Sequence, residues 1–467
     1  MAFFLNYFNK ILPQKFFLFA SLIFGILILF LTPPFQVPDE PNHFYRAWQV
    51  AEGGFVSVKQ NKRVGGELPA SLEKVAQPFF HMIWSNDAKI KDIGMHELFK
   101  IRLDPNERKF YDFNNTAMYS PICYFPEAAG IFILKTFNIP PLYIFYGARL
   151  FTLFFWVLLI YQAIRIIPIQ KWLFTFLALL PMSLYENMSL SADVVTNAVC
   201  FLFIAVILKC AYGPSFIDNK TLLYLCVLAF FLISVKTAYM PLVLLLFIIP
   251  TTQFKSKKEY VAKLAIVLFV GLLTFLLWGR LLNPLYISYE NYDSNYRDGA
   301  ALVNGADMQK QIHHILHHGF YLMNVLEKSV GAAFDMYFPG YIGVFGWLNV
   351  PFPAWFIYAA YLLIFFIAIT DSNTSIKMNW IARIIILSIF VVILFLVFLS
   401  QHLIWDPVGS EVILNIQGRY LISFAPLLFL LFYNSRISVK KILPAIVITT
   451  VTLSLLYSLE IIYLRYY

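Results

Sequence analysis

The chain has few charged residues and few cysteines, and these shortages exclude several classes of protein. Only 13% of the 467 residues are charged, whereas 60% are hydrophobic. A soluble domain cannot bury so much apolar surface, so the composition predicts a polytopic membrane protein. The four cysteines have no CxxC or CxxH spacing, which gives no support for a disulfide framework or a zinc site.

The net charge of +9 does not indicate nucleic-acid binding. The basic residues lie in short segments between apolar runs, where they are typical of topology signals and not of a stripe that follows phosphates. The sequence also has no P-loop, no internal repeat and no Gly/Ser-rich linker. We therefore expect a single integral-membrane domain over 1–467, with membrane lipids and no nucleic acid as partners.

The apolar runs predict an all-α fold with about eleven transmembrane helices. Several runs are shorter than the ~20 residues of an upright span, so they must use flanking residues or sit in a thinned part of the bilayer. The expected spans lie at roughly 16–35, 140–163, 171–186, 192–210, 221–235, 237–253, 260–282, 352–370, 379–401, 420–435 and 441–462.

Lysine and arginine gather on one side of this arrangement, as in the loop that holds Lys255, Lys257 and Lys258. The positive-inside rule then places the N-terminus in the cytoplasm. Two long loops fall on the outer face. The first long loop covers about 36–139 and the second long loop about 283–351.

The stretch 121–137 is apolar enough to suggest a twelfth span. Counting it would move every later loop to the opposite side and place the lysine-rich loop outside. We therefore expect a juxtamembrane or re-entrant helix, which is tolerated at membrane depth only when it packs on protein. An ordinary span is the alternative.

An acidic pair follows the first span directly. Asp39 and Glu40 lie between Pro38 and Pro41, and His43 and Arg46 come next, as further candidates for substrate binding. Transfer of a sugar from an anionic leaving group to a hydroxyl needs a base near the acceptor, and a carboxylate at the lipid–water boundary can provide it. The alternative is that the first carboxylate only caps a surface helix.

Several cations are expected on the same outer face. Arg149 lies in the second span, Lys236 interrupts an apolar sequence, and Arg419 with Tyr420 begins the tenth span. Ionisable groups in spans normally have a partner or a ligand. A cluster at one leaflet suits a polyprenyl-phosphate head group, because arginine offers bidentate contacts and lysine a point charge. The alternative is snorkelling to lipid phosphates, which best explains Arg280.

Asp193 begins the fourth span on the outer side. It is either an acid favoured by the helix dipole, or a group that orients the acceptor or pairs with one of the cations. The expected arrangement has Asp39 close to Arg149, Lys236 and Arg419.

Four histidines occupy a helical segment of the second long loop, at positions 313, 314, 317 and 318. Their spacing is compatible with a metal, but no HExxH motif or nearby acid accompanies them. This pattern indicates a solvated or interfacial helix, and we predict no metal ligands.

Several segments occur in a family-like order: VPDEPNHFYRAWQ, YSPICYFPEAAG, GARL, SLSAD, VKTAYMPL, GVFGWLN and QGRYLISFAP. This order resembles a family of bacterial polytopic membrane proteins that is itself similar to the GT-C glycosyltransferase superfamily. The resemblance covers nearly the whole chain. It implies a GT-C-like fold, Asp39 as the base with Glu40 as its neighbour, and donor-phosphate roles for Lys236 and Arg419.

The leading hypothesis is an enzyme of the bacterial cytoplasmic membrane that moves a sugar from a polyprenyl-phosphate donor to a lipid or glycan acceptor of the cell envelope. The resemblance implies inversion at the anomeric carbon. The residues leave open whether the cations act alone or together with a divalent ion, Mg²⁺ or Mn²⁺. The alternatives are a transporter or flippase of lipid-linked saccharides, which needs a polar path across the membrane, and a glycan polymerase or ligase.

Overall fold

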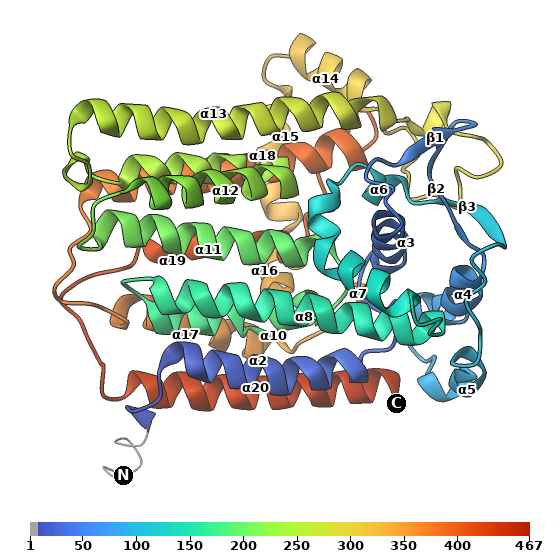
Figure 1. Cartoon of the computed structure of the whole chain (residues 1–467), viewed down its shortest axis with the longest axis horizontal. Coiled ribbons are helices and arrows are strands. Elements are labelled where there is room, and N and C mark those ends of the chain that lie inside the picture. The colour runs from blue at the N-terminus through green and yellow to red at the C-terminus, as the bar shows by residue number, and fades with distance from the viewer. Residues whose placement is uncertain (1–7) are drawn as a thin grey trace.

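Residues 8–467 are described by a computed structural model, and most of them are helical (Figure 1). Among these residues, six helices are long and apolar enough to cross a membrane. They are α2 (Pro13–Leu31), α8 (Pro141–Ile166), α11 (Ala192–Tyr212), α13 (Lys257–Leu282), α18 (Trp380–Trp405) and α20 (Leu443–Tyr466). The prediction of a helical membrane protein is confirmed.

Shorter helices occupy the other expected positions. An interruption at a proline explains some of the short lengths, because proline begins a helix more readily than it continues one. Pro181, for example, begins the second half of the segment expected at 171–186. The shorter helices are α9 (Lys171–Ala178), α10 (Pro181–Asn187), α12 (Asn219–Val235), η3 (Thr237–Ile248), α17 (Ala354–Thr370), η7 (Gly418–Leu421) and α19 (Ala425–Leu430).

Helix α11 is the central helix of the bundle. Nearly all of its side chains are buried, and it packs against α8, α12 and η3. By contrast, α13 lies at the edge of the bundle and has mostly exposed side chains (Figure 1). A helix that is apolar all round needs protein on every side or lipid around it, and the two helices represent these two cases.

The first long loop lies at one end of the bundle, beside the C-terminal end of α20 (Figure 1). It also contains a three-stranded antiparallel sheet, which the all-α prediction did not anticipate. Gly65 explains part of this failure, because a glycine weakens a strand pattern. Here it lets the chains approach, since a Cβ at Gly65 would lie 1.7 Å from the carbonyl oxygen of Tyr111. The elements are α3 (Glu40–Ala51), β1 (Val58–Gln60), β2 (Arg63–Pro69), α4 (Ser71–Trp84), η1 (Ile90–Asp92), α5 (Met95–Leu98), β3 (Arg108–Asp112), α6 (Asn114–Ala117), η2 (Pro121–Tyr124) and α7 (Phe125–Lys135).

The stretch expected to be a juxtamembrane helix forms η2 and α7. Helix α7 has 11 residues, which corresponds to about 16 Å at the rise of an α-helix, against a hydrocarbon core of about 30 Å. It packs on α8 and α3. Its length and its contacts with protein agree with the prediction of a helix that does not span.

The second long loop covers the same end of the bundle and is joined to the first. The hydroxyl of Tyr292 donates to Asp112 on β3 (2.7 Å) and accepts from the backbone N–H of Val64 on β2 (3.1 Å). The two loops therefore form one layer over the ends of the helices. The second long loop contains η5 (Asn283–Leu285), η6 (Tyr289–Asn291), α14 (Met308–His317), α15 (Tyr321–Ala332), α16 (Phe334–Ile342), β4 (Val344–Phe345) and β5 (Val350–Pro351). The short helix η4 (Thr251–Gln253) lies outside this loop, between η3 and α13.

Candidate functional site

Asp39 stands at the N-cap position of α3, but its side chain does not cap the helix. Its backbone has the left-handed values φ 64° and ψ 0°, and no capping hydrogen bond forms. Instead, Arg419 donates to Oδ2 (2.8 Å) and the amide of Asn115 donates to Oδ1 (3.2 Å). A left-handed aspartate is uncommon, and here its carboxylate contacts Arg419 and Asn115 and makes no capping bond to α3.

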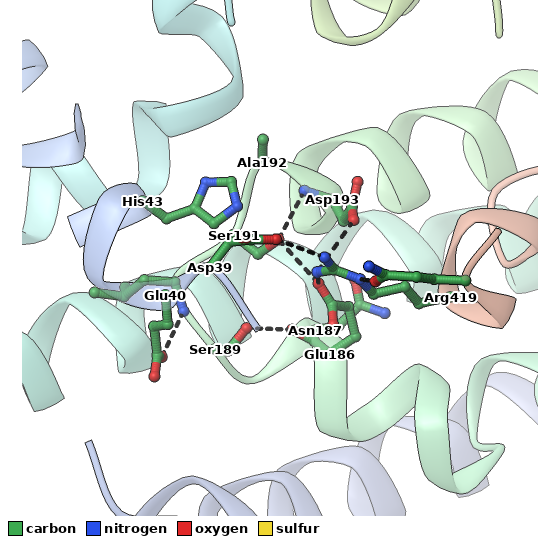
Figure 2. A network of polar contacts seen from close by, with 12 residues as sticks. Asp39, Glu40, His43, Glu186, Asn187, Ser189, Ser191, Ala192, Asp193 and Arg419 are labelled. Carbon is green, nitrogen blue, oxygen red and sulfur yellow. Dashed lines mark hydrogen bonds and ion pairs between the residues drawn. The ribbon is translucent and has the colours of Figure 1, made fainter. Parts of the chain in front are cut away.

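Glu40 has a different environment. Its carboxylate is fully buried and forms a bidentate pair with Arg149, at 2.8 Å from Nε and 2.6 Å from Nη2. The backbone N–H of Leu190 also donates to Oε1 (3.0 Å). Figure 2 shows that Glu40 points away from Arg419, whereas Asp39 points toward it. The pair links α3 to α8 and to the segment before α11, and this placement favours a structural role for both partners.

Arg149 makes three further bonds that support this interpretation. It donates to the backbone carbonyls of Leu29, Thr32 and Pro33 at the end of α2. These carbonyls have no partner inside the helix, because no helical N–H group follows the last turn to donate to them. All the hydrogen-bonding capacity of the guanidinium is thus directed at protein groups.

Arg419, on η7, lies among three carboxylates. Besides Asp39, it contacts Glu186 at the end of α10 (3.2 Å) and Asp193 at the start of α11 (3.8 Å). Its Nε donates to Gln417 (2.6 Å). Figure 2 shows the three carboxylates and Arg419 converging from different elements.

Lys236 forms an ion pair with Asp193. Its ammonium also lies 5.4 Å from the ring centroids of both Tyr119 and Tyr420, within cation–π range. Asp193 therefore pairs with the cations, as one of the two sequence interpretations expected. We call Asp39, Glu186, Asp193, Lys236 and Arg419 the charge cluster.

A cavity of about 580 Å³ lies beside the charge cluster. Asp39, Asp193, Lys236 and Arg419 line it, but Glu186 does not. The other walls come from α13, α18 and the second long loop. One side of the cavity is thus charged and another apolar, which fits a ligand that has an ionic head and an apolar part.

His43 also lines the cavity, and its Nδ1 lies 2.9 Å from the hydroxyl of Tyr124. Burial lowers the pKa of His43 to about 4, although Asp39 and Asp193 act in the opposite direction. The imidazole is therefore neutral at physiological pH. It can exchange hydrogen bonds with a ligand but does not add a positive charge.

Arg46 does not line the cavity. It donates to the side chain of Gln49 (2.5 Å) and to the backbone carbonyls of Gly54 (2.9 Å) and Phe55 (2.8 Å). These bonds hold the turn that leads from α3 into the sheet. The sequence placed Arg46 with the substrate-binding residues, and its position favours support of the loop.

The remaining candidates lie at the margins. Arg280 lines the cavity near the end of α13 and is exposed. Three of the four histidines stand on α14 and His318 follows its last residue. His313 stacks on His317 at 3.8 Å between ring centroids. Within residues 8–467, no three His, Cys, Asp or Glu side chains come together in a way that could hold a metal ion.

Glu186 is the main residue that sequence reasoning missed. It is fully buried, and its Oε1 accepts from Ser191 (2.9 Å) and Arg419. A signal was present, because an acid in an apolar run is costly and normally has a partner. Glu186 is the last residue of the span expected at 171–186 and was not among the candidate residues.

The comparisons with known proteins identify a family. No match was found among curated proteins or among solved structures. A family model described as "Predicted membrane protein (DUF2142)" matches residues 22–428, which include all the residues of the charge cluster. The chain therefore belongs to the DUF2142 family of membrane proteins.

Proposed function

We propose that this protein is a membrane glycosyltransferase that moves a sugar from a polyprenyl-phosphate donor to an acceptor of the cell envelope. Its site would lie on the outer face of a bacterial cytoplasmic membrane, with the N-terminus in the cytoplasm. One observation carries the proposal. The Asp39 carboxylate, 33% exposed, faces a cavity beside Lys236 and Arg419, and apolar helices form another wall of the same cavity.

Asp39 is suited to be the base. One oxygen accepts from Asn115 and the other from Arg419, and each retains a second lone-pair direction for a hydroxyl. The acceptor hydroxyl would give its proton to this carboxylate while its oxygen bonds to the anomeric carbon. The bond from that carbon to the phosphate oxygen breaks, and its electron pair leaves with the phosphate. Inversion is the outcome expected from the resemblance to GT-C enzymes.

Lys236 and Arg419 are suited to the leaving phosphate. Lys236 uses one of its three N–H donors on Asp193, and Arg419 uses three of its five on Gln417, Glu186 and Asp39. The remaining donors are held in place by buried acids before any ligand arrives. Fixed donors of this kind stabilise developing negative charge without reorganisation.

A divalent ion has no prepared protein site in this proposal. Because the described side chains do not form a metal-binding group, an Mg²⁺ or Mn²⁺ ion would take most of its ligands from phosphate and water. We therefore propose that Lys236 and Arg419 stabilise the negative charge of the leaving phosphate.

The test is a comparison of a deletion strain complemented with the wild type or with Asp39→Asn. Mass spectrometry of envelope glycans and of lipid-linked sugars gives the readout. We expect Asp39→Asn to be inserted normally, to lose one sugar substituent from the glycans and to accumulate the lipid-linked donor. Normal glycans in the Asp39→Asn strain would favour a flippase instead, and a change in polymer length without loss of a substituent would favour a polymerase.

A further inference from the structure

The apolar part of the cavity is formed by two helices that contact different neighbours. Phe275, Leu276 and Gly279 of α13 contribute one side, and Val397 and Ile404 of α18 contribute the other. Helix α13 packs mainly on α12, whereas α18 packs mainly on η3. The cavity thus extends between two helices that each have their own support.

The apolar walls reach the surface of the protein. Leu276 is 57% exposed and Ile404 is 44% exposed, although both line the cavity. Helix α13 is a candidate membrane span with few buried side chains, so its exposed face is suited to lipid. The cavity is therefore continuous with a surface suited to the hydrocarbon phase.

Gly279 marks the point where the cavity meets the backbone of α13. A Cβ built on Gly279 would have no heavy atom within 4 Å. The same helix offers a contrast at Gly271, where a Cβ would lie 2.6 Å from Ile233. Glycine in a helix interior costs about 0.5–1 kcal/mol relative to alanine. Close packing accounts for Gly271, but at Gly279 the structure has open space.

The surrounding residues fit the boundary between hydrocarbon and head groups. Trp278, whose indole donates to Ser234 (3.2 Å), and Trp405 at the end of α18 both line the cavity. Tryptophan is enriched at this level of a membrane, and Arg280 provides an exposed cation beside it. Lipid phosphates at this level would lie next to the opening.

We propose that the gap between the C-terminal halves of α13 and α18 is a lateral entry, in which the isoprenoid chain of the donor lies while its phosphate reaches Lys236 and Arg419. The identity of the chain rests on the function proposed above. The chain would pass Gly279 and continue along the exposed face of α13 at Leu276. The charge cluster selects the phosphate, and the open space at Gly279 leaves room for the first isoprene units.

The experiment is photo-crosslinking in nanodiscs of phosphatidylethanolamine and phosphatidylglycerol, with a photoreactive polyprenyl phosphate as the probe. Gly279→Trp places a large side chain in the gap. The matched control is Gly331→Trp on α15, because Gly331 is also helical and also has no heavy atom within 4 Å of a built Cβ. We expect labelled peptides from α13 and α18 in the wild type and the control, and at least a tenfold loss of label in Gly279→Trp.

A second variant keeps the test decisive if Gly279→Trp folds poorly. Leu276→Cys is purified in folded form and is then modified with thiol reagents of increasing size. Labelling by the probe should fall as the reagent grows. Labelling that is unchanged by Gly279→Trp and by the largest reagent, or label on other helices, would overturn the proposal. Equal competition by excess phosphatidylglycerol would do the same, because it would indicate general lipid contact.

The readout separates this proposal from the proposed function. Crosslinking does not require sugar transfer, so Asp39→Asn should be labelled like the wild type. If the gap is labelled normally but Asp39→Asn does not change the glycans, the lateral entry is supported and the glycosyltransferase function is contradicted. If a strain that carries Gly279→Trp makes normal glycans, the lateral entry is contradicted and the glycosyltransferase function is not.

Discussion

Two consecutive carboxylates, Asp39 and Glu40, have opposite environments in this structure. Glu40 is sealed against Arg149 with no exposed surface, whereas Asp39 faces a cavity and pairs with Arg419 at its edge. The left-handed backbone at Asp39 separates the two side chains, and α3 begins between them. The comparison teaches that an acidic pair can combine a structural anchor with an accessible group, each with its own arginine.

The largest effect should come from breaking the sealed pair. Glu40→Ala leaves the Arg149 guanidinium buried without its carboxylate, which costs about 3–5 kcal/mol. We expect little folded protein, as measured by fluorescence size-exclusion chromatography in detergent. Glu67→Ala is the control, because Glu67 is exposed on β2 of the same loop. If Glu40→Ala is as stable as the wild type, the pair between Glu40 and Arg149 does not have the structural role assigned to it.

Asp39→Asn should separate the two residues most clearly. Asparagine keeps the shape and tolerates the left-handed backbone, so the melting temperature should stay close to that of the wild type. Sugar transfer should fall by about 10²–10⁴-fold, the range for loss of a general base. Retained transfer by a folded Asp39→Asn protein would show that this carboxylate is not the base.

Arg419→Lys should have an intermediate effect. Lysine keeps the charge but cannot contact Asp39 and Glu186 together, so one hydrogen bond to a charged group is lost, at about 1.5–3 kcal/mol. This corresponds to a loss of transfer of about 10–100-fold. The same exchange at the exposed Arg436 should leave transfer unchanged. An Arg419→Lys protein as active as the wild type would argue against two simultaneous contacts.

The smallest effect concerns His43, on the cavity side of α3. Its folded-state pKa is lowered to about 4 by burial, below the value of about 6.5 for an unfolded chain. Between pH 6.5 and 4 the unfolded chain takes up a proton that the folded protein does not, so stability should fall with falling pH. His43→Gln should remove part of this fall in melting temperature, whereas the exposed His81→Gln should not. Identical pH profiles for all three proteins would contradict this.

The sequence predicted the positions of the helices, because hydropathy is a local property. It also selected Asp39, Lys236 and Arg419, since charges near the ends of apolar runs are visible one residue at a time. The assignment of partners was not predictable in this way. Arg149 was expected near Asp39 but is held by Glu40, because the left-handed turn that separates the two acids has no reliable signature outside glycine.

Two other features escaped prediction for similar reasons. The partnership of Glu186 with Arg419 joins residues 233 positions apart, and no local pattern encodes such a distance. The short sheet of the first long loop depends on Gly65, because a glycine lets the backbones of two strands approach closely. Strand propensity does not favour glycine, so the pattern gave no sign of this strand. The family match spans residues 22–428 and depends on sequence alone, whereas the partners of each charged residue depend on the three-dimensional fold.

The backbone angle at position 39 has a consequence for genetics. With φ at 64°, glycine and asparagine fit the turn, while an ordinary side chain is strained by roughly 1–2 kcal/mol. Variants with every amino acid at this position can therefore be selected in two steps. The first step measures the amount of protein that reaches the membrane, and the second measures survival under envelope stress. Codons that pass the first selection and fail the second would be those whose defect is chemical.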